Sequence, residues 1–134
     1  MIPSVNTILT TELTVVQTPS KQYRMDFDKL RIRDACDNLE AVRQAVFKIL
    51  NTERYDFIIY SWDYGIELKD LYGQPHMYVC PEITRRVKEA LLQDDRITDV
   101  TDFEFDTSEQ GVIAVSFTVH TIFGDLEEEL AVNI

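Results

Sequence analysis

Glycine is scarce in this chain, and long hydrophobic runs are absent from it. Only four of the 134 residues are Gly, whereas loops that cradle phosphate or a dinucleotide need several glycines at fixed spacing. The sequence also carries no nucleophile motif built on Ser or Cys. No run of about 18 apolar residues occurs, and no basic start leads into an apolar N-terminal stretch. We therefore expect a soluble, unprocessed protein without a membrane span.

Cysteine and histidine are few and isolated as well. Cys36 and Cys80 stand outside any CxxC or Cys/His spacing, and two cysteines in a chain of this length do not make a disulfide framework. His76 and His120 are also single, whereas a zinc site needs clustered ligands. We expect reduced, partly buried thiols and neither a metal nor another cofactor.

Basic residues are nearly missing from the last third of the chain. The net charge is −11, and residues 94–134 hold eleven acidic residues against one base, Arg96. Residues 1–93 are almost balanced, with thirteen acids and twelve bases. An acidic surface repels nucleic-acid phosphates and anionic lipid, so we expect neither as a partner. Two interpretations stay open: a solvated face that maintains solubility, or a surface that meets a basic partner.

The first third predicts an extended arm, short extended structure and a helix. Residues 1–20 are rich in Thr, Ser and Pro and are expected to form an arm. Apolar residues alternate through Tyr23–Phe27 and on to Ile32, which favours a short strand or a β-turn pair. Asp37 stands three residues before Glu40, as in a capping box. The apolar stripe that follows predicts the main core helix, from Asn38 to about Asn51.

The middle of the chain predicts a strand, a helical turn and a loop. Phe57–Trp62 is β-branched and aromatic, which is typical of a short strand or a buried extended segment. Glu67–Tyr72 fits one helical turn, because Gly73 follows it. Gln74–Cys80 contains a proline and is expected to be a loop.

A second helix is expected over residues 81–93, with Pro81 at its first position. Its apolar stripe comprises Ile83, Val87, Ala90 and Leu91. Its outward side is expected to be basic, through Arg85, Arg86 and Lys88.

From Arg96 onward the apolar period changes to two, which predicts three strands. Turn residues at 107–111 and at Gly124-Asp125 separate them, so we expect an antiparallel meander. The predicted fold class is α+β: two main helices packed on a C-terminal three-stranded meander, with an extended N-terminal arm. Residues 21–134 are expected to form one domain.

Five tyrosine and tryptophan residues lie within eighteen positions: Tyr55, Tyr60, Trp62, Tyr64 and Tyr72. We expect most of them to be buried or half-buried, with one or two exposed as interface anchors.

Several of these segments resemble one known family. An apolar helix end leads into a Thr-containing turn over Ile49–Tyr55, and an aromatic loop with two glycines follows over Trp62–Gly73. Asp94–Ile97, Tyr23–Phe27 and Leu39–Ala45 match further motifs. Together they resemble the wedge and sheath-initiator family of contractile phage tail baseplates, in the branch from prophages and phage-tail-like particles of Gram-positive bacteria. The family's Glu-Pro-Arg element reads Asp94-Asp95-Arg96 here and lacks the fixed φ of proline.

The resemblance implies a structural, non-enzymatic baseplate component in a virion or tail-like particle, assembled in the bacterial host cytoplasm. Its implied partners are baseplate wedge proteins and the tail sheath protein, with the tail tube or hub as a further candidate. Partner contacts are expected from Arg54 and the acid–arginine element, and sheath templating from the C-terminal strand. The expected partner-binding residues are Arg54, Asp94, Asp95, Arg96, Leu126, Leu130, Val132 and Ile134. An ordinary domain would instead use both arginines in intramolecular ion pairs.

Two alternatives from other classes stay open. The family was once described as lysozyme-like, and glycoside hydrolysis needs two distinguished carboxylates across a cleft. Glu53, Asp63, Glu67 and Asp70 lie near aromatic residues, yet nothing in the sequence singles out a pair. We therefore assign no catalytic residue. The other alternative is a small acidic regulatory binding module.

Overall fold

The computed structural model describes residues 14, 16 and 19–134. The arm expected over residues 1–20 lies almost entirely outside them. Two strands come first, β1 (Gln22–Asp26) and β2 (Arg31–Cys36), and helix α1 (Asn38–Leu50) follows. A 3-10 turn (Lys69–Leu71) precedes helix α2 (His76–Leu91). The chain ends in three strands, β3 (Ile97–Asp106), β4 (Val112–Thr121) and β5 (Gly124–Asn133).

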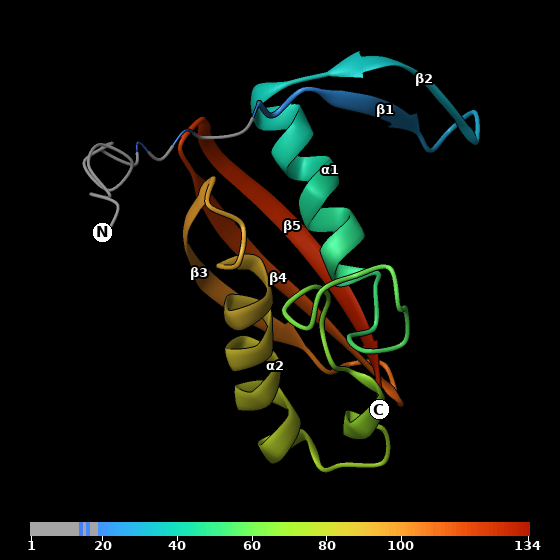
Figure 1. Cartoon of the computed structure of the whole chain (residues 1–134). Coiled ribbons are helices and arrows are strands. Elements are labelled where there is room, and N and C mark those ends of the chain that lie inside the picture. The colour runs from blue at the N-terminus through green and yellow to red at the C-terminus, as the bar shows by residue number, and fades with distance from the viewer. Residues whose placement is uncertain (1–13, 15, 17–18) are drawn as a thin grey trace, which may run out of the picture.

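The three C-terminal strands form an antiparallel sheet in the order β3-β4-β5, and both helices lie on one face of it (Figure 1). Alternate strand residues point at the helices, because side chains change face at every position along a strand. The core between the layers is almost wholly aliphatic. The predicted α+β meander is therefore confirmed, although its second turn is formed by Ile122 and Phe123, and Gly124-Asp125 begins β5 instead. The described residues include no helix with the length and apolar character needed to cross a membrane.

The hairpin of β1 and β2 stands away from this sheet and is held by α1 (Figure 1). Buried Gln44 accepts a hydrogen bond from the Met25 amide at 2.9 Å and donates one to the Tyr23 carbonyl at 2.7 Å. Buried polar groups are almost always hydrogen-bonded, so Gln44 fixes the strand edge to the helix. Of the two predicted possibilities, a short strand or a β-turn pair, the structure has the pair.

Helix α1 occupies the predicted range, but the capping box does not form as expected. The Asp37 carboxylate accepts from the adjacent Asn38 amide at 2.8 Å. Glu40 pairs with Arg24 of the hairpin at 2.9 Å instead of reaching back to Asp37. The helix start is thus fixed partly by a contact with β1.

Helix α2 begins five residues before the predicted start at Pro81, so the loop predicted over Gln74–Cys80 is wrong. Pro75 takes the N-cap position, and its carbonyl accepts from the amides of Tyr78 at 2.9 Å and Val79 at 3.1 Å. Val79 is fully buried one turn before Ile83. The apolar stripe therefore extends one turn further back than the proline suggested.

The strand predicted over Phe57–Trp62 is also wrong. This segment consists of turns and bends, and its side chains are exposed. The turn predicted over Glu67–Tyr72 is present as the 3-10 turn. The aromatic residues differ from expectation too, since only Tyr64 is half-buried against the core. The other four are exposed: Tyr55, Tyr60, Trp62 and Tyr72.

Candidate functional site

The acid–arginine element forms the turn between α2 and β3. The Asp94 carboxylate accepts from the Arg96 guanidinium through both oxygens, at 2.9 Å from Nε and 2.6 Å from Nη2. It also accepts from the Arg96 backbone amide at 3.0 Å. The side chains of Arg96 and Asp94 are only 15% and 12% exposed. The pair therefore makes one rigid turn, and Asp95 stays on its exposed side.

The Asp94–Arg96 pair shifts the pKa of both of its members. Burial by itself raises the pKa of Asp94, but the hydrogen bonds and charge of Arg96 outweigh it and hold that pKa below its ordinary value. The hydrogen bond with Asp94 in turn raises the pKa of Arg96. Both groups stay ionised at neutral pH, so the turn presents a fixed dipole rather than a titrating group.

Two hollows flank this turn. One, of about 300 Å³, lies between the ends of the two helices and the loop before Gly65. Its lining residues are Ile49, Ser61, Asp63, Tyr64, Ala90, Gln93 and Asp94. The other, of about 370 Å³, is lined by Pro19, Gln93, Asp94, Asp95 and Arg96. Asp94 borders both hollows, so a partner that fills either of them contacts the acid–arginine turn.

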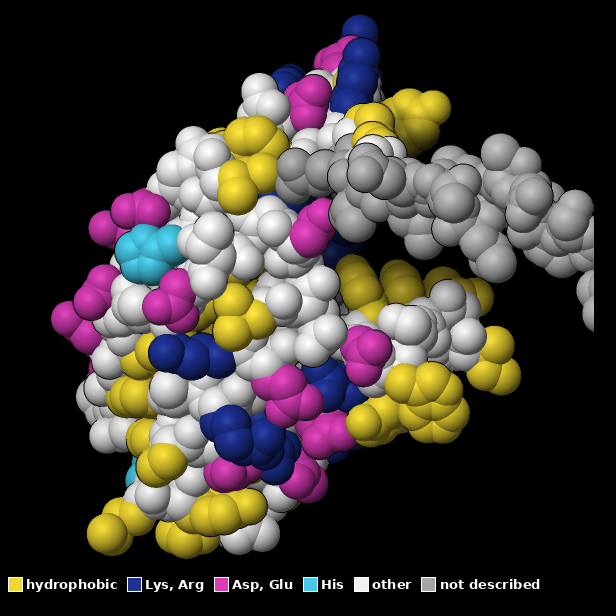
Figure 2. Space-filling view, turned by 60° about the vertical axis from the view of Figure 1, so that its left-hand side comes forward, with side chains coloured by type: hydrophobic (Ala, Val, Ile, Leu, Met, Phe, Trp, Pro, Cys, Tyr) yellow, Lys and Arg dark blue, Asp and Glu magenta, His cyan; other side chains and the backbone are white. Residues whose placement is uncertain are grey.

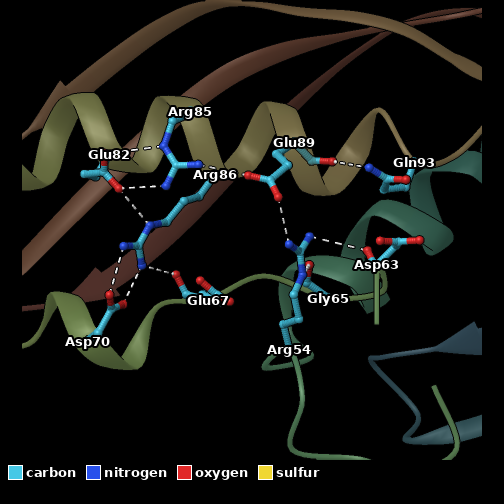
Figure 3. A network of polar contacts seen from close by, with 10 residues as sticks. All are labelled: Arg54, Asp63, Gly65, Glu67, Asp70, Glu82, Arg85, Arg86, Glu89 and Gln93. Carbon is cyan, nitrogen blue, oxygen red and sulfur yellow. Dashed lines mark hydrogen bonds and ion pairs between the residues drawn. The ribbon is translucent and has the colours of Figure 1, made fainter. Parts of the chain in front are cut away.

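Arg54 holds together the two ends of the loop that follows α1, which lies between Thr52 and Ile66. Its side chain is 9% exposed and donates to the Gly65 carbonyl at 3.2 Å and to Glu89 of α2 at 2.9 Å (Figure 3). Burial lowers the pKa of Arg54, but Glu89 outweighs this and the pKa is raised. An intramolecular pair was one of the two expectations for Arg54, although its partner is Glu89 rather than the neighbouring Glu53.

Glu53 also stabilises the base of this loop. Its carboxylate accepts from the backbone amides of Leu68 and Lys69, each at 3.1 Å. Gly65 lies so close to the chain that a Cβ on it would be 2.6 Å from the Thr52 carbonyl oxygen. The loop between Thr52 and Ile66 is therefore closed tightly where it leaves the domain.

A further cluster of charges on α2 was missed in the sequence. Arg86 was expected to point outward, but it is buried and bridges α2 to the 3-10 turn (Figure 3). It pairs with Asp70 through two nitrogens, with Glu82 at 3.1 Å and with the Glu67 carbonyl at 2.8 Å. The hydrogen bond with Asp70 raises the pKa of Arg86 and lowers that of the acid. The spacing of Glu82 and Arg86, four apart on one helix, was the available signal.

The outward face of α2 is consequently far less basic than expected. Arg85 pairs with Glu82 and Glu89, each at 2.9 Å, and Arg86 is neutralised inside the domain. The expected contrast between a basic helix face and an acidic sheet is mostly cancelled by these acids.

Strand β5 lies at an edge of the sheet, paired only with β4 among the described residues. Three of its expected partner-binding side chains are buried in the domain core: Leu126, Leu130 and Val132. Ile134 is half-buried and packs against the same core. What the strand offers to a partner is therefore its outer backbone edge rather than its apolar side chains.

Two of the four carboxylates considered for hydrolysis are occupied by contacts inside the domain. A general acid needs a raised pKa, whereas Arg86 lowers the pKa of Asp70. Glu53 is held by backbone amides. In the described part of the chain, no group of three or more His, Cys, Asp or Glu side chains is arranged to hold a metal ion. Cys36 is buried and Cys80 half-buried, and both thiols are free.

Comparison with known proteins identifies the family. The family model described as the contractile injection system sheath initiator matches residues 21–124. The chain is also 44% identical over 123 residues to the phage-like element PBSX protein XkdS of Bacillus subtilis (strain 168), covering 88% of this chain and 85% of that protein. The matched range contains the acid–arginine turn, the clamped loop and both helices. The chain therefore belongs to the contractile injection system sheath initiator family.

Proposed function

We propose that this protein docks on the wedge proteins of a baseplate through the acid–arginine turn and presents the outer edge of β5 as the first template strand for a sheath subunit. The family places the chain among structural components of contractile tails, which act with other tail and baseplate proteins. No chemical step belongs to this role. Assembly takes place in the cytoplasm of the bacterial host.

The exposed edge of β5 is the observation that carries the proposal. The Ile134 amide donates to the Gly111 carbonyl at 3.0 Å, and Thr121 faces Gly124 across the tight turn. In an antiparallel ladder, inward and outward backbone groups alternate. The N–H and C=O groups of the odd-numbered residues from Asp125 to Asn133 therefore point away from β4. They form a ready edge for strand addition.

A hollow beside the end of this edge supports the same role. It has a volume of about 380 Å³ and lies between β5 and the 3-10 turn. Its lining residues are Glu53, Leu68, Lys69, Tyr72, Ala131, Val132 and Asn133. A strand that adds to the edge would place side chains of alternate residues over this hollow, which gives the added strand a preferred register.

The free protein needs protection at such an edge. Glu127 and Glu129 are exposed on β5, and like charges on an edge oppose pairing between two copies. The same acids favour a strand flanked by Lys or Arg, so we expect sheath attachment to weaken as salt rises.

Proline at Ala131 tests the edge directly. The Ala131 amide points outward, and proline removes that donor without breaking a bond to β4. We expect the Ala131→Pro protein to fold and to enter baseplates, which then carry tubes without sheath in electron micrographs. Ala131→Val is the matched control, because it retains the N–H group, and it should give sheathed tails. Sheathed tails from the proline variant would contradict the template role.

Docking through the turn has its own test. Asp95 is exposed next to the buried pair, so Asp95→Lys reverses a charge at the proposed contact without disturbing the Asp94–Arg96 bonds. We expect a folded protein that fails to enter baseplates. Glu109→Lys, an exposed change in the turn between β3 and β4, is the control. Equal incorporation of both variants would remove the turn from the docking surface.

A further inference from the structure

The loop clamped by Arg54 carries an exposed apolar surface that the proposed function does not use. We call residues 55–62 the aromatic lobe, and Figure 2 shows hydrophobic side chains gathered on a projection of the body. Ile58 is fully exposed and Trp62 is 80% exposed. The remaining large exposed side chains of the lobe are Tyr55, Phe57, Ile59 and Tyr60. Proteins in solution rarely leave contiguous apolar patches of this kind uncovered.

The lobe is held in one shape before anything binds it. Tyr60 stacks on Tyr64 with ring centroids 4.3 Å apart, and the rings of Tyr55 and Trp62 lie 5.5 Å apart. The two ends of the loop are held together by the hydrogen bond from Arg54 to the Gly65 carbonyl and by the close approach of Gly65 to Thr52. A surface that is already ordered loses little conformational entropy on binding. The lobe is therefore built as a docking surface rather than as a flexible connection.

The charges around the lobe indicate the kind of surface that it fits. Residues 53–63 contain three acids, Glu53, Asp56 and Asp63, and one base, Arg54, which is buried in its clamp. Glu53 is held by backbone amides and Asp56 pairs with Lys69, so Asp63 is the acid of the three that stays exposed without such a contact among the described residues. The net charge of the segment stays negative, which disfavours anionic lipid and favours an apolar surface with basic residues around it.

The chain itself has such a surface at the other end of α1. The β1–β2 hairpin exposes four large side chains: Tyr23, Phe27, Leu30 and Ile32. Residues 21–36 hold five bases against three acids, in a chain whose net charge is −11. Three of the bases pair with acids, Arg24 with Glu40, Arg31 with Asp26 and Arg33 with Asp34. The hairpin nevertheless keeps a net positive charge in an acidic chain.

We propose that two copies of the free protein associate about a twofold axis, with the aromatic lobe of each copy seated on the β1–β2 hairpin of the other. The hairpin precedes α1 and the lobe follows it, and both lie on the same side of the molecule in Figure 1. The 13 residues of α1 separate them by about 20 Å at 1.5 Å per residue. Two antiparallel copies thus make the same contact twice, as a twofold interface requires.

The size of the contact is adequate for a specific pair. A large aromatic side chain brings roughly 150 to 250 Å² of surface. Several such groups on each lobe and hairpin, counted over two equivalent contacts, reach the roughly 1,200 to 2,000 Å² that specific interfaces bury. Association of this kind covers the lobe in the free protein and is independent of the β5 edge.

Sedimentation equilibrium of the full chain measures the association. We expect a monomer–dimer equilibrium with a dissociation constant below about 100 μM. Salt should weaken the association, because the lobe and the hairpin carry net charges of opposite sign. A lobe variant with Ile58→Ser and Trp62→Ser and a hairpin variant with Leu30→Ser and Ile32→Ser should each raise the dissociation constant at least tenfold. Met77→Ser, at an exposed apolar position outside both surfaces, is the control and should change nothing. Circular dichroism checks that each variant is folded.

Mixing the two variants gives the decisive measurement. The mixture still contains one intact lobe and one intact hairpin, so it should form a heterodimer tighter than either variant forms alone. A mixture no tighter than its parts indicates lobe-to-lobe contact and overturns the pairing. A wild-type chain that stays monomeric throughout overturns the proposal entirely. Neither result bears on baseplate incorporation, which is assayed separately.

Discussion

Replacing Arg96 by alanine separates the internal role of this residue from a role toward a partner. The change leaves the Asp94 carboxylate, whose side chain is 12% exposed, without its two guanidinium bonds. Removing one member of a well-buried pair costs about 3 to 5 kcal/mol, and the residual exposure here reduces this to about 2 to 3 kcal/mol. Small domains are stable by about 5 to 15 kcal/mol, so the variant should remain folded at 25 °C.

Urea unfolding followed by circular dichroism measures this loss. With a slope of about 1 to 3 kcal/mol per molar urea, the midpoint should fall by roughly 1 to 2 M. Arg24→Ala is the control, because its pair with Glu40 is about half exposed on both sides and should contribute under about 1 kcal/mol. An unchanged midpoint in Arg96→Ala would refute the buried-pair argument. Normal entry of the destabilised variant into baseplates at 25 °C would show that Arg96 acts only inside the domain.

The same variant has a distinct pH dependence. The pKa of Asp94 in the folded protein lies below the ordinary value of 3.8, so the pair stabilises the fold above pH 3.8. This contribution disappears as the pH falls through the lowered folded pKa. Without the guanidinium, the backbone amide of residue 96 still lowers the pKa of Asp94, but the larger effect of burial raises it above 3.8, so protonation relieves the variant. The difference in free energy of unfolding between wild type and variant should therefore be largest near neutral pH. It should begin to shrink as the pH falls through the raised pKa of the variant and shrink further below pH 3.8.

Three other outcomes are expected. Gly65→Ala should lower the free energy of unfolding by at least about 2 kcal/mol, because φ is positive and the new Cβ meets the Thr52 carbonyl. Gly73→Ala is the control, since Gly73 also has a positive φ but open space around it. Equal losses of stability in urea for the two variants would contradict the close approach at Gly65. Arg86→Ala should cost about 3 kcal/mol in the same assay, since buried bonds to two acids are lost, and a loss below 1 kcal/mol would contradict this. The purified protein should not clear peptidoglycan in zymograms; clearing that Glu53→Gln abolishes would overturn the structural role.

The parts of the fold that local pattern determines were predictable from the sequence. The period of two after Arg96 and the helical stripe of α1 each follow from burial on one face, and both elements appear where predicted. The start of α2 was not, because Pro81 is a strong local signal for a first helical position. It was overridden by the burial of Val79 one turn earlier, a tertiary effect that the proline does not report.

The surroundings of Arg54 and Arg86 were harder to predict, because their partners lie far away in the sequence. Phe57–Trp62 has strand propensity, yet Arg54 and Gly65 close the loop at its base and leave no neighbouring strand for pairing. Arg86 looked like an outward residue, but its acids come from two elements. The spacing in the sequence indicates only Glu82, the partner on the same helix. Resemblance to the family supplied the importance of the acid–arginine element, while its internal bidentate pairing required the structure.

Alternate residues of β5 have different roles, one set in the domain core and the other at the outer edge of the sheet. Leu126, Leu130 and Val132 point into the core, so substitutions there change the stability of the domain before they affect any partner. The backbone groups of Ala131 point away from β4, so a change at that position acts on the edge alone. Because the two sets alternate along a single strand, a folded domain and an available edge are produced by the same ten residues. A sheath defect accompanied by unchanged unfolding therefore belongs to the edge, whereas a defect that follows the unfolding midpoint belongs to the core.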